Sequence, residues 1–366
     1  MNSNFEGNPW LWPISAALRM SAATLDAFGA LSAIGVEPAR RLEPAWTTPH
    51  SIVLELPQLR LRQFGEGDGR PVVVVAPYAV HGPVLADLAP GHSLIARLLA
   101  EGLTRVVLVE WKSATPAMRF LRIDDYLALL LVVVVELGAP LKLVGLCQGG
   151  WLSLMFAARF PEKVSAVVLA GAPVDLHAAP SKLVVATRDA TPGGFERLVQ
   201  DDGLVSGPVL LSLWGKQDVE ETVIADCLQI DAPAHDVLQR FQIWHAWTID
   251  LPGAYYLQVV EDLFRRNKLA YGEFRALGRL IDLAAVRTPL FLIAAEEDDV
   301  SPPAQVFAAR RLVGTRPGEV ATVLGRGGHL SLFMGARNLE SVWRDAARWL
   351  AGGAKKARRQ SDRPTC

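Results

Sequence analysis

Short hydrophobic runs, rich in valine and leucine, recur along the chain from residue 72 onward. The clearest are Val72–Ala76, Val106–Glu110, Leu141–Gly145, Val164–Ala170, Leu290–Ala294 and Val320–Leu324. Continuous apolar runs are typical of strands that are buried on both faces. Helical patterns lie between these runs, at Ser93–Glu101, Asp124–Leu137, Trp151–Arg159 and Gln305–Leu312. This alternation predicts an α/β protein with a mostly parallel central sheet and helices on both faces.

Two segments depart from this alternation. The segment Ser51–Phe64 alternates with period two around Pro57, which predicts an antiparallel hairpin at the sheet edge. Between Asp175 and Val286 the strand signals stop, and helical patterns dominate. Aromatic residues gather in this insertion: Trp214, Trp244, Trp247, Tyr255 and Tyr256. We therefore expect a helical N-terminal segment (1–50), one α/β domain (51–350) with a lid or cap at 176–286, and a disordered basic tail (351–366).

Composition narrows the functional classes. The chain has 366 residues, 51% of them hydrophobic, and a formal net charge of −1, so no electrostatic attraction to nucleic acid is expected. The most apolar stretch, Tyr126–Val135, is too short to span a bilayer, so no transmembrane segment is expected. The three cysteines, Cys147, Cys227 and Cys366, form neither a disulfide framework nor a zinc-binding spacing. A reducing, cytoplasmic setting fits this count best.

One cysteine lies in a motif that is typical of a reactive nucleophile. The segment Gly145–Gly149 reads G-x-C-x-G, with the predicted strand LKLVGL before it and the helical WLSLMFAARF after it. This is the pattern of a nucleophile elbow with Cys147 in place of serine. The glycines permit the sharp turn, and the start of the following helix favours negative charge on the sulfur. The N–H of Gln148 would then face a developing oxyanion. The alternative is a buried structural cysteine beside a glycine turn.

The partners of such a cysteine are expected later in the chain, in the order acid and then histidine. Asp298 follows the strand-like PLFLIAAEE, and we favour it over the neighbouring Asp299 as the acid. His329 lies on a glycine-rich loop before the last predicted helix. A neutral imidazole can accept the thiol proton, and Asp298 can hold its tautomer. This set disfavours the structural alternative for Cys147.

The loop Tyr78–Gly82 follows the first buried strand and is expected to supply a second oxyanion donor, from Ala79 or Val80. His81 in the same loop either lines the pocket or is only a hydrogen-bonded loop residue. The remaining histidines have no metal-binding spacing, so no metal site is expected. They are His50, His92, His177, His235 and His245.

From about Val72 to Leu350, the chain resembles the polyhydroxyalkanoate (poly-3-hydroxybutyrate) synthase family, the cysteine-nucleophile branch of the α/β-hydrolase fold. The resemblance rests on the G-x-C-x-G-G box at Gly145–Gly150, the segment VLADLAPGHSLIARLLAEGL, Trp111, Ile123–Tyr126, Arg265–Leu283, Glu296–Pro303 and Gly327–Gly335. It implies that Cys147 carries the acyl group, that His329 is the base and that Asp298 is its acid partner.

Two stretches differ from the family pattern. Synthases usually carry a tryptophan and an asparagine–lysine pair where this chain has Tyr78–Gly82, and their SWRNP-like stretch reads EWKSA at Glu110–Ala114. Related intracellular depolymerases resemble the chain at YYLQVVEDLFRRNKLAYGEF and EEDDVS. The box, however, continues as Gly149-Gly150, as it does in synthases.

The resemblance implies acyl transfer from 3-hydroxyacyl-CoA, a substrate and not a cofactor, onto the hydroxyl of a growing polyester. It implies no cofactor. A cysteine hydrolase, either a depolymerase or a hydroxyacyl thioesterase, is one alternative, and a non-catalytic granule-associated subunit is another. The expected location is the cytoplasm or the surface of polyester granules. The expected assembly is a homodimer or a complex with a second synthase subunit.

Overall fold

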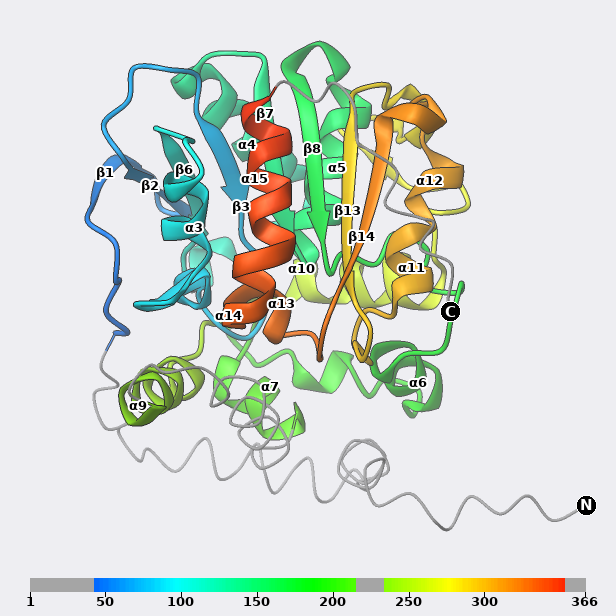
Figure 1. Cartoon of the computed structure of the whole chain (residues 1–366). Helices are drawn as coiled ribbons and strands as arrows, with labels where there is room; N and C mark the ends of the chain where they lie inside the picture. Colours follow the sequence, from blue (N-terminus) through cyan, green and yellow to red (C-terminus); the bar gives the residue numbers. More distant parts are fainter. Residues whose placement is uncertain (1–42, 215–233, 353–366) are drawn as a thin grey trace, which may run out of the picture.

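The computed structural model describes residues 43–214 and 234–352, which are coloured in Figure 1. Its centre is an eight-stranded sheet in the order β1-β2-β6-β3-β7-β8-β13-β14. The strands are β1 (His50–Glu55), β2 (Leu59–Phe64), β3 (Val72–Val75), β6 (Val106–Trp111), β7 (Leu141–Leu146), β8 (Val164–Ala170), β13 (Leu290–Ala295) and β14 (Val320–Gly325). Pairing is antiparallel at β1–β2 and β2–β6, and parallel from β6 onward. The predicted fold class is confirmed. The predicted N-terminal segment up to residue 42 and the tail from residue 353 lie outside the described residues.

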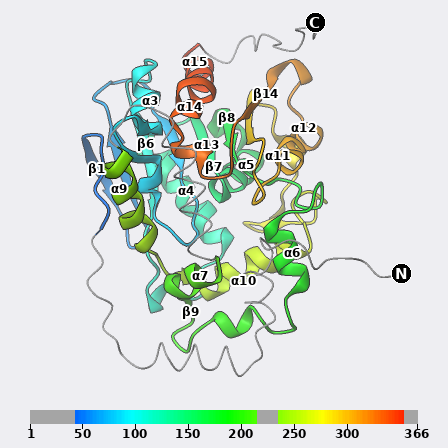
Figure 2. The same cartoon turned by 60° about the horizontal axis from the view of Figure 1, so that its bottom comes forward.

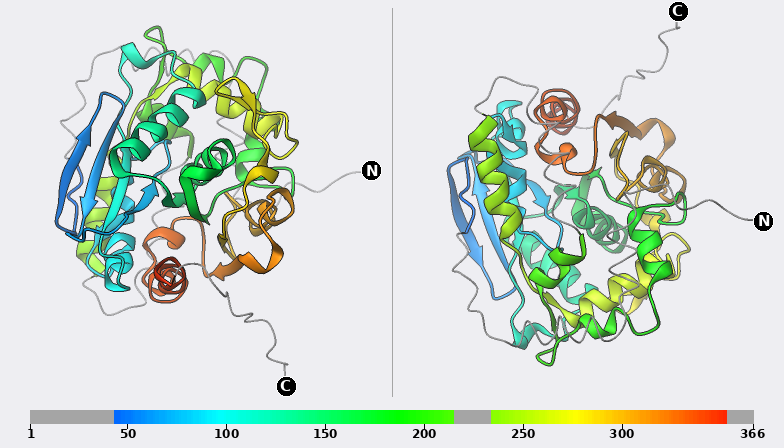
Figure 3. Two further views of the ribbon diagram at one scale, coloured as in Figure 1. Left: turned by 90° about the horizontal axis from the view of Figure 1, so that it is seen from above. Right: turned by 90° about the horizontal axis from the view of Figure 1, so that it is seen from below.

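Alternating side chains of each buried strand pack on opposite faces of the sheet. In β3, Val73 and Val75 join the core that includes α4 (Ile123–Leu137) and α5 (Gln148–Arg159). Val72 and Val74 join the core that includes α3 (Leu94–Ala100) and α15 (Arg344–Ala351). Figures 1 and 3 show these helices on the two sides of the sheet. Both faces are covered, which explains why the central strands are mostly apolar.

Helix boundaries differ most from the sequence prediction at two places, α5 and the segment Gln305–Leu312. Helix α5 begins at Gln148, immediately after the elbow, and not at Trp151. A Cβ atom on Gly149 would lie 2.1 Å from the carbonyl oxygen of Val75, so the first turn of α5 packs closely on β3. The helix predicted over Gln305–Leu312 is divided into α11 (Pro303–Phe307) and α12 (Ala309–Leu312).

The hydrophobic stretch Tyr126–Val135 belongs to α4, which is 15 residues long. No helix among the described residues is long and apolar enough to cross a membrane. Not all of this stretch is core, because Val135 is 78% exposed on the outer side of the helix.

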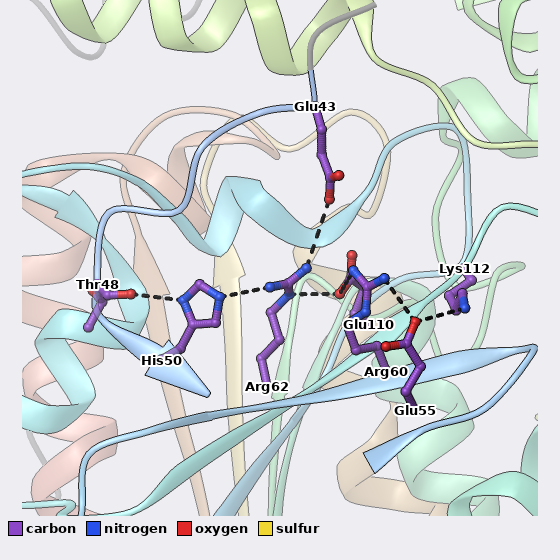
Figure 4. A network of polar contacts seen from close by, with 8 residues as sticks. All are labelled: Glu43, Thr48, His50, Glu55, Arg60, Arg62, Glu110 and Lys112. Atoms are coloured by element: carbon purple, nitrogen blue, oxygen red, sulfur yellow. Dashed lines mark hydrogen bonds and ion pairs between the residues drawn. The ribbon is translucent and has the colours of Figure 1, made fainter. Parts of the chain in front are cut away.

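A network of charged side chains fixes the antiparallel edge of the sheet (Figure 4). Arg62 on β2 donates from Nε to Glu110 on β6 at 2.7 Å, and both side chains are buried. The Nη1 atom of Arg62 lies 2.7 Å from Nε2 of His50 on β1. Glu55 pairs with Arg60 and Lys112 at 3.0 Å each, nearer to solvent. Charge pairing therefore links all three edge strands.

The segment between β8 and β13 contributes mainly short helices. Its elements include α6 (Lys182–Asp189), β9 (Leu204–Val205), α7 (Gly207–Trp214), α9 (Ala234–Ala246), β10 (Leu251–Pro252), α10 (Gly253–Gln258) and the π-helical segment η6 (Val259–Arg265). Helices α6, α7 and α9 lie below the sheet in Figure 1 and come forward in Figure 2. This insertion contacts the loop after β3, where the Ile249 N–H donates to the Val80 carbonyl at 2.9 Å. It also contacts the loop after β13, where Lys182 Nζ lies 2.6 Å from Asp299. The segment that the sequence predicts to be a lid therefore contacts loops at the carboxyl ends of the strands.

Candidate active site

Cys147 lies on a strained turn between β7 and α5. Its backbone has φ 48° and ψ −117°, in the left-handed range that non-glycine residues seldom adopt. Hydrogen bonds hold the turn, from Cys147 N–H to the Ala170 carbonyl at 2.8 Å and from Gly150 N–H to the Cys147 carbonyl at 2.9 Å. A Cβ atom on Gly145 would lie 2.3 Å from the Cα of Gly150, so the turn needs glycine there. The thiol is free and partly exposed.

His329 and Asp298 form a close pair beside this cysteine. His329 Nδ1 lies 2.7 Å from Asp298 Oδ2. The other carboxylate oxygen accepts the backbone N–H groups of Val300 at 3.0 Å and Ser301 at 2.7 Å. Cys147 lies close enough to the imidazole to raise the pKa of His329. Because Nδ1 faces the carboxylate, Nε2 is the ring nitrogen left for the thiol.

The electrostatics of the pair favour a charged imidazole. Burial alone would lower the pKa of His329, but the Asp298 carboxylate and then Cys147 raise it well above its usual value. Burial would raise the pKa of Asp298, yet the charge of His329 and the hydrogen bonds to the carboxylate lower it. The carboxylate is therefore ionised, and it stabilises an imidazolium beside Cys147.

Cys147 and His329 open into a cavity of about 240 Å³. The insertion supplies much of its wall, including Leu211, Trp244, His245 and Phe264. A second, largely apolar cavity of about 120 Å³ adjoins it. Both cavities are bounded by Ala79, Val80, Gln148, Leu183 and Phe264. Cys147 therefore borders a largely apolar space.

The proposed oxyanion donors also lie at this cavity. Gln148, Ala79 and Val80 line it. Among the described residues, the backbone N–H groups of these three donate no hydrogen bond to another protein group. The carbonyl of Val80 is held by Ile249, which fixes the loop. The cavity wall thus contains the three residues from which the sequence predicts oxyanion donors.

The structure brings Cys147, Asp298 and His329 together, although they are far apart in the sequence. Asp299 is not part of this set, because it pairs with Lys182. His81 lines the cavity.

The sequence patterns assign no role to two further side chains near the site. Tyr255 donates from its hydroxyl to Gln148 Oε1 at 3.4 Å. The ring centroid of His245 lies 5.1 Å from that of His81. No local pattern marks either residue, because their place follows from how the insertion folds back over the sheet.

A mostly parallel sheet, a cysteine on the strand-to-helix elbow and a histidine–carboxylate pair define a protein of the α/β-hydrolase fold. Solved structures agree with this class. The monoacylglycerol lipase of Paleococcus ferrophilus superposes with a TM-score of 0.54, covering 81% of this chain and 99% of the lipase. The two sequences are 15% identical, so this likeness concerns the fold alone.

Sequence comparisons define the family. A family model described as a protein of unknown function (DUF3141) matches residues 63–309, which is more than half of the chain. The poly(3-hydroxyalkanoate) polymerase subunit PhaC of Synechocystis sp. is 31% identical over 258 residues, 65% of this chain and 67% of that relative. The subunit PhaC of Haloferax mediterranei is 26% identical over 332 residues, 83% of this chain and 64% of that relative. The chain belongs to the poly(3-hydroxyalkanoate) polymerase family, whose curated members are named as enzymes, and it spans about two thirds of the length of these two relatives.

Proposed function

We propose that the protein is an acyltransferase of the polyhydroxyalkanoate synthase type, which transfers 3-hydroxyacyl groups from CoA thioesters to a hydroxyl group. The observation that carries this proposal is the hydrogen-bonded pair His329–Asp298 beside Cys147, at the wall of a largely apolar cavity. Family membership supports the substrate class, because the relatives are named as poly(3-hydroxyalkanoate) polymerases.

The first half of the reaction forms an acyl-enzyme. His329 takes the thiol proton, and the sulfur of Cys147 attacks the thioester carbonyl of a 3-hydroxyacyl-CoA. The negative oxygen of the tetrahedral intermediate is held by the N–H of Gln148 together with that of Ala79 or Val80. The carbon–sulfur bond to CoA then breaks, and the imidazolium of His329 returns its proton to the leaving thiolate.

The second half transfers the acyl group to an alcohol. A hydroxyl from another acyl unit or a chain end loses its proton to His329 and attacks the enzyme thioester. The new ester bond forms as the Cys147–carbon bond breaks, and His329 returns the proton to the thiol. A thioester keeps the acyl group activated for this step. The apolar walls favour an organic hydroxyl over water as the acceptor.

Incubation with 3-hydroxybutyryl-CoA tests the proposal directly. CoA release is followed with a thiol reagent, and the products are separated as polymer or free acid. Oligomeric or polymeric ester formed with CoA release supports the transferase. The absence of CoA release from a folded protein contradicts it.

A hydrolase is the second candidate, and the loop after β3 favours it. Tyr78–Gly82 lacks the tryptophan and the asparagine–lysine pair that synthases usually carry. Release of free 3-hydroxybutyrate with CoA, and no ester product, would assign the protein to this class. Binding to polymer with an inert site would assign it instead to a non-catalytic granule subunit.

We also propose that the protein works at polyester granules in the cytoplasm, as a homodimer or with a second subunit. Its substrate class supports this placement, because the product is an insoluble polyester. Sedimentation with isolated granules, and the molecular mass in solution with and without substrate, test it.

A further inference from the structure

A partly buried histidine that the mechanism above does not use lies in the wall of the cavity. His81 follows β3, and its side chain lines the space that also holds Cys147 and His329. Its Nδ1 atom is buried and has no hydrogen-bond partner among the described residues. Buried polar atoms in folded proteins usually have partners, so an unpaired nitrogen at a ligand cavity points to a group that the ligand supplies.

The surroundings of His81 hold its ring in place and keep it neutral. The ring lies 4.4 Å from that of Trp244, between centroids, and 5.1 Å from that of His245. Trp244 is fixed in turn, because its Nε1 donates to the Gly82 carbonyl at 2.8 Å. Burial is the larger cause, and the nearby His245 the smaller one, of a His81 pKa that is lowered to about 3. The Trp247 backbone raises this pKa, but by less than the other two lower it. The imidazole is therefore uncharged at physiological pH.

A neutral imidazole nitrogen at this place selects for one kind of ligand group. It is a poor partner for a phosphate or carboxylate, which pairs best with a cation. A hydroxyl group both donates and accepts a hydrogen bond, so it satisfies Nδ1 in either tautomer of the ring. The substrate proposed above carries a hydroxyl close to the carbonyl that Cys147 attacks.

We propose that His81 binds the 3-hydroxyl group of the acyl unit and so selects hydroxyacyl over plain acyl thioesters. This assignment rests on the proposed function, because it takes the substrate from it. His81 is then a specificity-determining residue and not a base, since that role belongs to His329, which pairs with Asp298 and lines the same cavity as Cys147. A site that pairs a substrate hydroxyl disfavours analogues without it, because its own polar atom stays buried and unpaired.

Binding in the Cys147→Ala background tests this inference without turnover. The dissociation constants of 3-hydroxybutyryl-CoA and butyryl-CoA are measured by calorimetry, with His81 intact and with His81→Leu. With His81 intact, we expect the hydroxylated ligand to bind at least about tenfold more tightly, and we expect His81→Leu to remove most of this preference. His81→Asn, which keeps a hydrogen-bonding atom near the position of Nδ1, should retain part of it. His177→Leu, at an exposed histidine outside this cavity, should leave the preference unchanged.

The outcomes separate this inference from the proposed function. Equal or absent binding of the two ligands with His81 intact overturns the inference, and so does an unchanged preference in a folded His81→Leu protein. If wild-type protein releases no CoA while the Cys147→Ala protein still prefers the hydroxylated ligand, the transferase proposal fails and the role of His81 stands. Melting curves of each variant establish that it is folded.

Discussion

Cys147 combines a strained backbone with the side chain on which the proposed chemistry depends. Its positive φ belongs to the turn between β7 and α5, and Cys147 lines the same cavity as His329. The hydrogen bonds of the elbow, and the glycines that flank it, hold this conformation against its intrinsic cost of roughly 1–3 kcal/mol. Because the surrounding backbone holds this conformation, we expect residue 147 to keep it when the side chain is replaced.

We therefore predict that Cys147 variants fold but lose acyl transfer. Cys147→Ala removes the nucleophile and should abolish CoA release from 3-hydroxybutyryl-CoA. Cys147→Ser should reduce it by at least about 100-fold, because a hydroxyl is a weaker nucleophile than a thiolate at neutral pH. The melting temperature reports whether each variant is folded. Turnover by a folded Cys147→Ala protein would exclude the covalent mechanism.

Asp298 acts through His329, so its replacement should change a measurable property of that histidine. Asp298→Asn removes the carboxylate that is the main cause of the raised His329 pKa. We predict that the imidazole titrates above pH 6.5 in the wild type, and at lower pH in Asp298→Asn, when followed by NMR of the ring protons. CoA release should fall by about 100-fold or more, because the tautomer and the imidazolium lose their support. Asp299→Asn is the matched control and should leave both properties unchanged.

The same pair makes stability depend on pH in a defined direction. A raised His329 pKa contributes stability below the usual value of 6.5, and this contribution is lost as pH rises through the raised pKa. A lowered Asp298 pKa contributes stability above the usual value of 3.8. This contribution is lost as pH falls through the lowered pKa. The stability difference between wild type and Asp298→Asn, from urea denaturation, should be largest between these usual values. A difference that grows toward alkaline pH would contradict this assignment.

The junction between β3 and α5 sets the geometry of the elbow at the scale of elements. The first turn of α5 lies so close to the end of β3 that only hydrogen atoms fit between Gly149 and the Val75 carbonyl. Because β3 and β7 are paired neighbours, any shift of α5 moves the elbow relative to the loop that carries Ala79 and Val80. Close packing at this junction therefore aligns the two proposed sources of oxyanion donors.

We predict that Gly149→Ala disrupts this junction. Its Cβ would meet the backbone oxygen of Val75 at 2.1 Å, and backbone cannot move aside as a side-chain tip can. The expected loss is about 1–3 kcal/mol of unfolding free energy or more, together with a large loss of CoA release. Gly318→Ala is a matched control, because no atom lies within 4 Å of its added Cβ, and it should change stability by no more than about 0.5 kcal/mol. Equal stability of the two variants would show that the junction has room.

At the scale of the whole molecule, charged residues join the hydrophobic core in holding the antiparallel end of the sheet. Arg62 and Glu110 are buried together where β1 and β2 join the parallel strands (Figure 4). Removal of one partner of a buried ion pair leaves an uncompensated charge. This edge thus depends on pairing between strands that are distant in sequence.

We predict that Glu110→Ala destabilises the protein by about 3–5 kcal/mol in chemical denaturation, because Arg62 loses its main partner. Glu55→Ala, at the exposed end of the same network, should have a much smaller effect, since solvent screens its pairs. Similar losses of unfolding free energy in the two variants would mean that burial does not determine how much each ion pair contributes to stability.

The sequence predicted the architecture well because its signals are local. Continuous apolar runs mark strands that are covered on both faces, and Val164–Ala170 has the same bounds in the sequence prediction and in β8. The start of α5 was misplaced, because Gly149 and Gly150 reduce helix propensity in isolation. Only contact with β3 shows why small residues are required in that first turn.

The sequence by itself determined the α/β class, the elbow around Cys147 and the family resemblance, because each is built from short patterns that can be recognised one at a time along the chain. The tertiary structure decided which side chains meet. It placed Asp298 and not Asp299 against His329, since Asp299 faces Lys182 of the insertion. It also brought His245 beside His81 across more than 160 positions of chain. Such meetings depend on how the insertion packs over the ends of the strands, and no local pattern of residues encodes that packing.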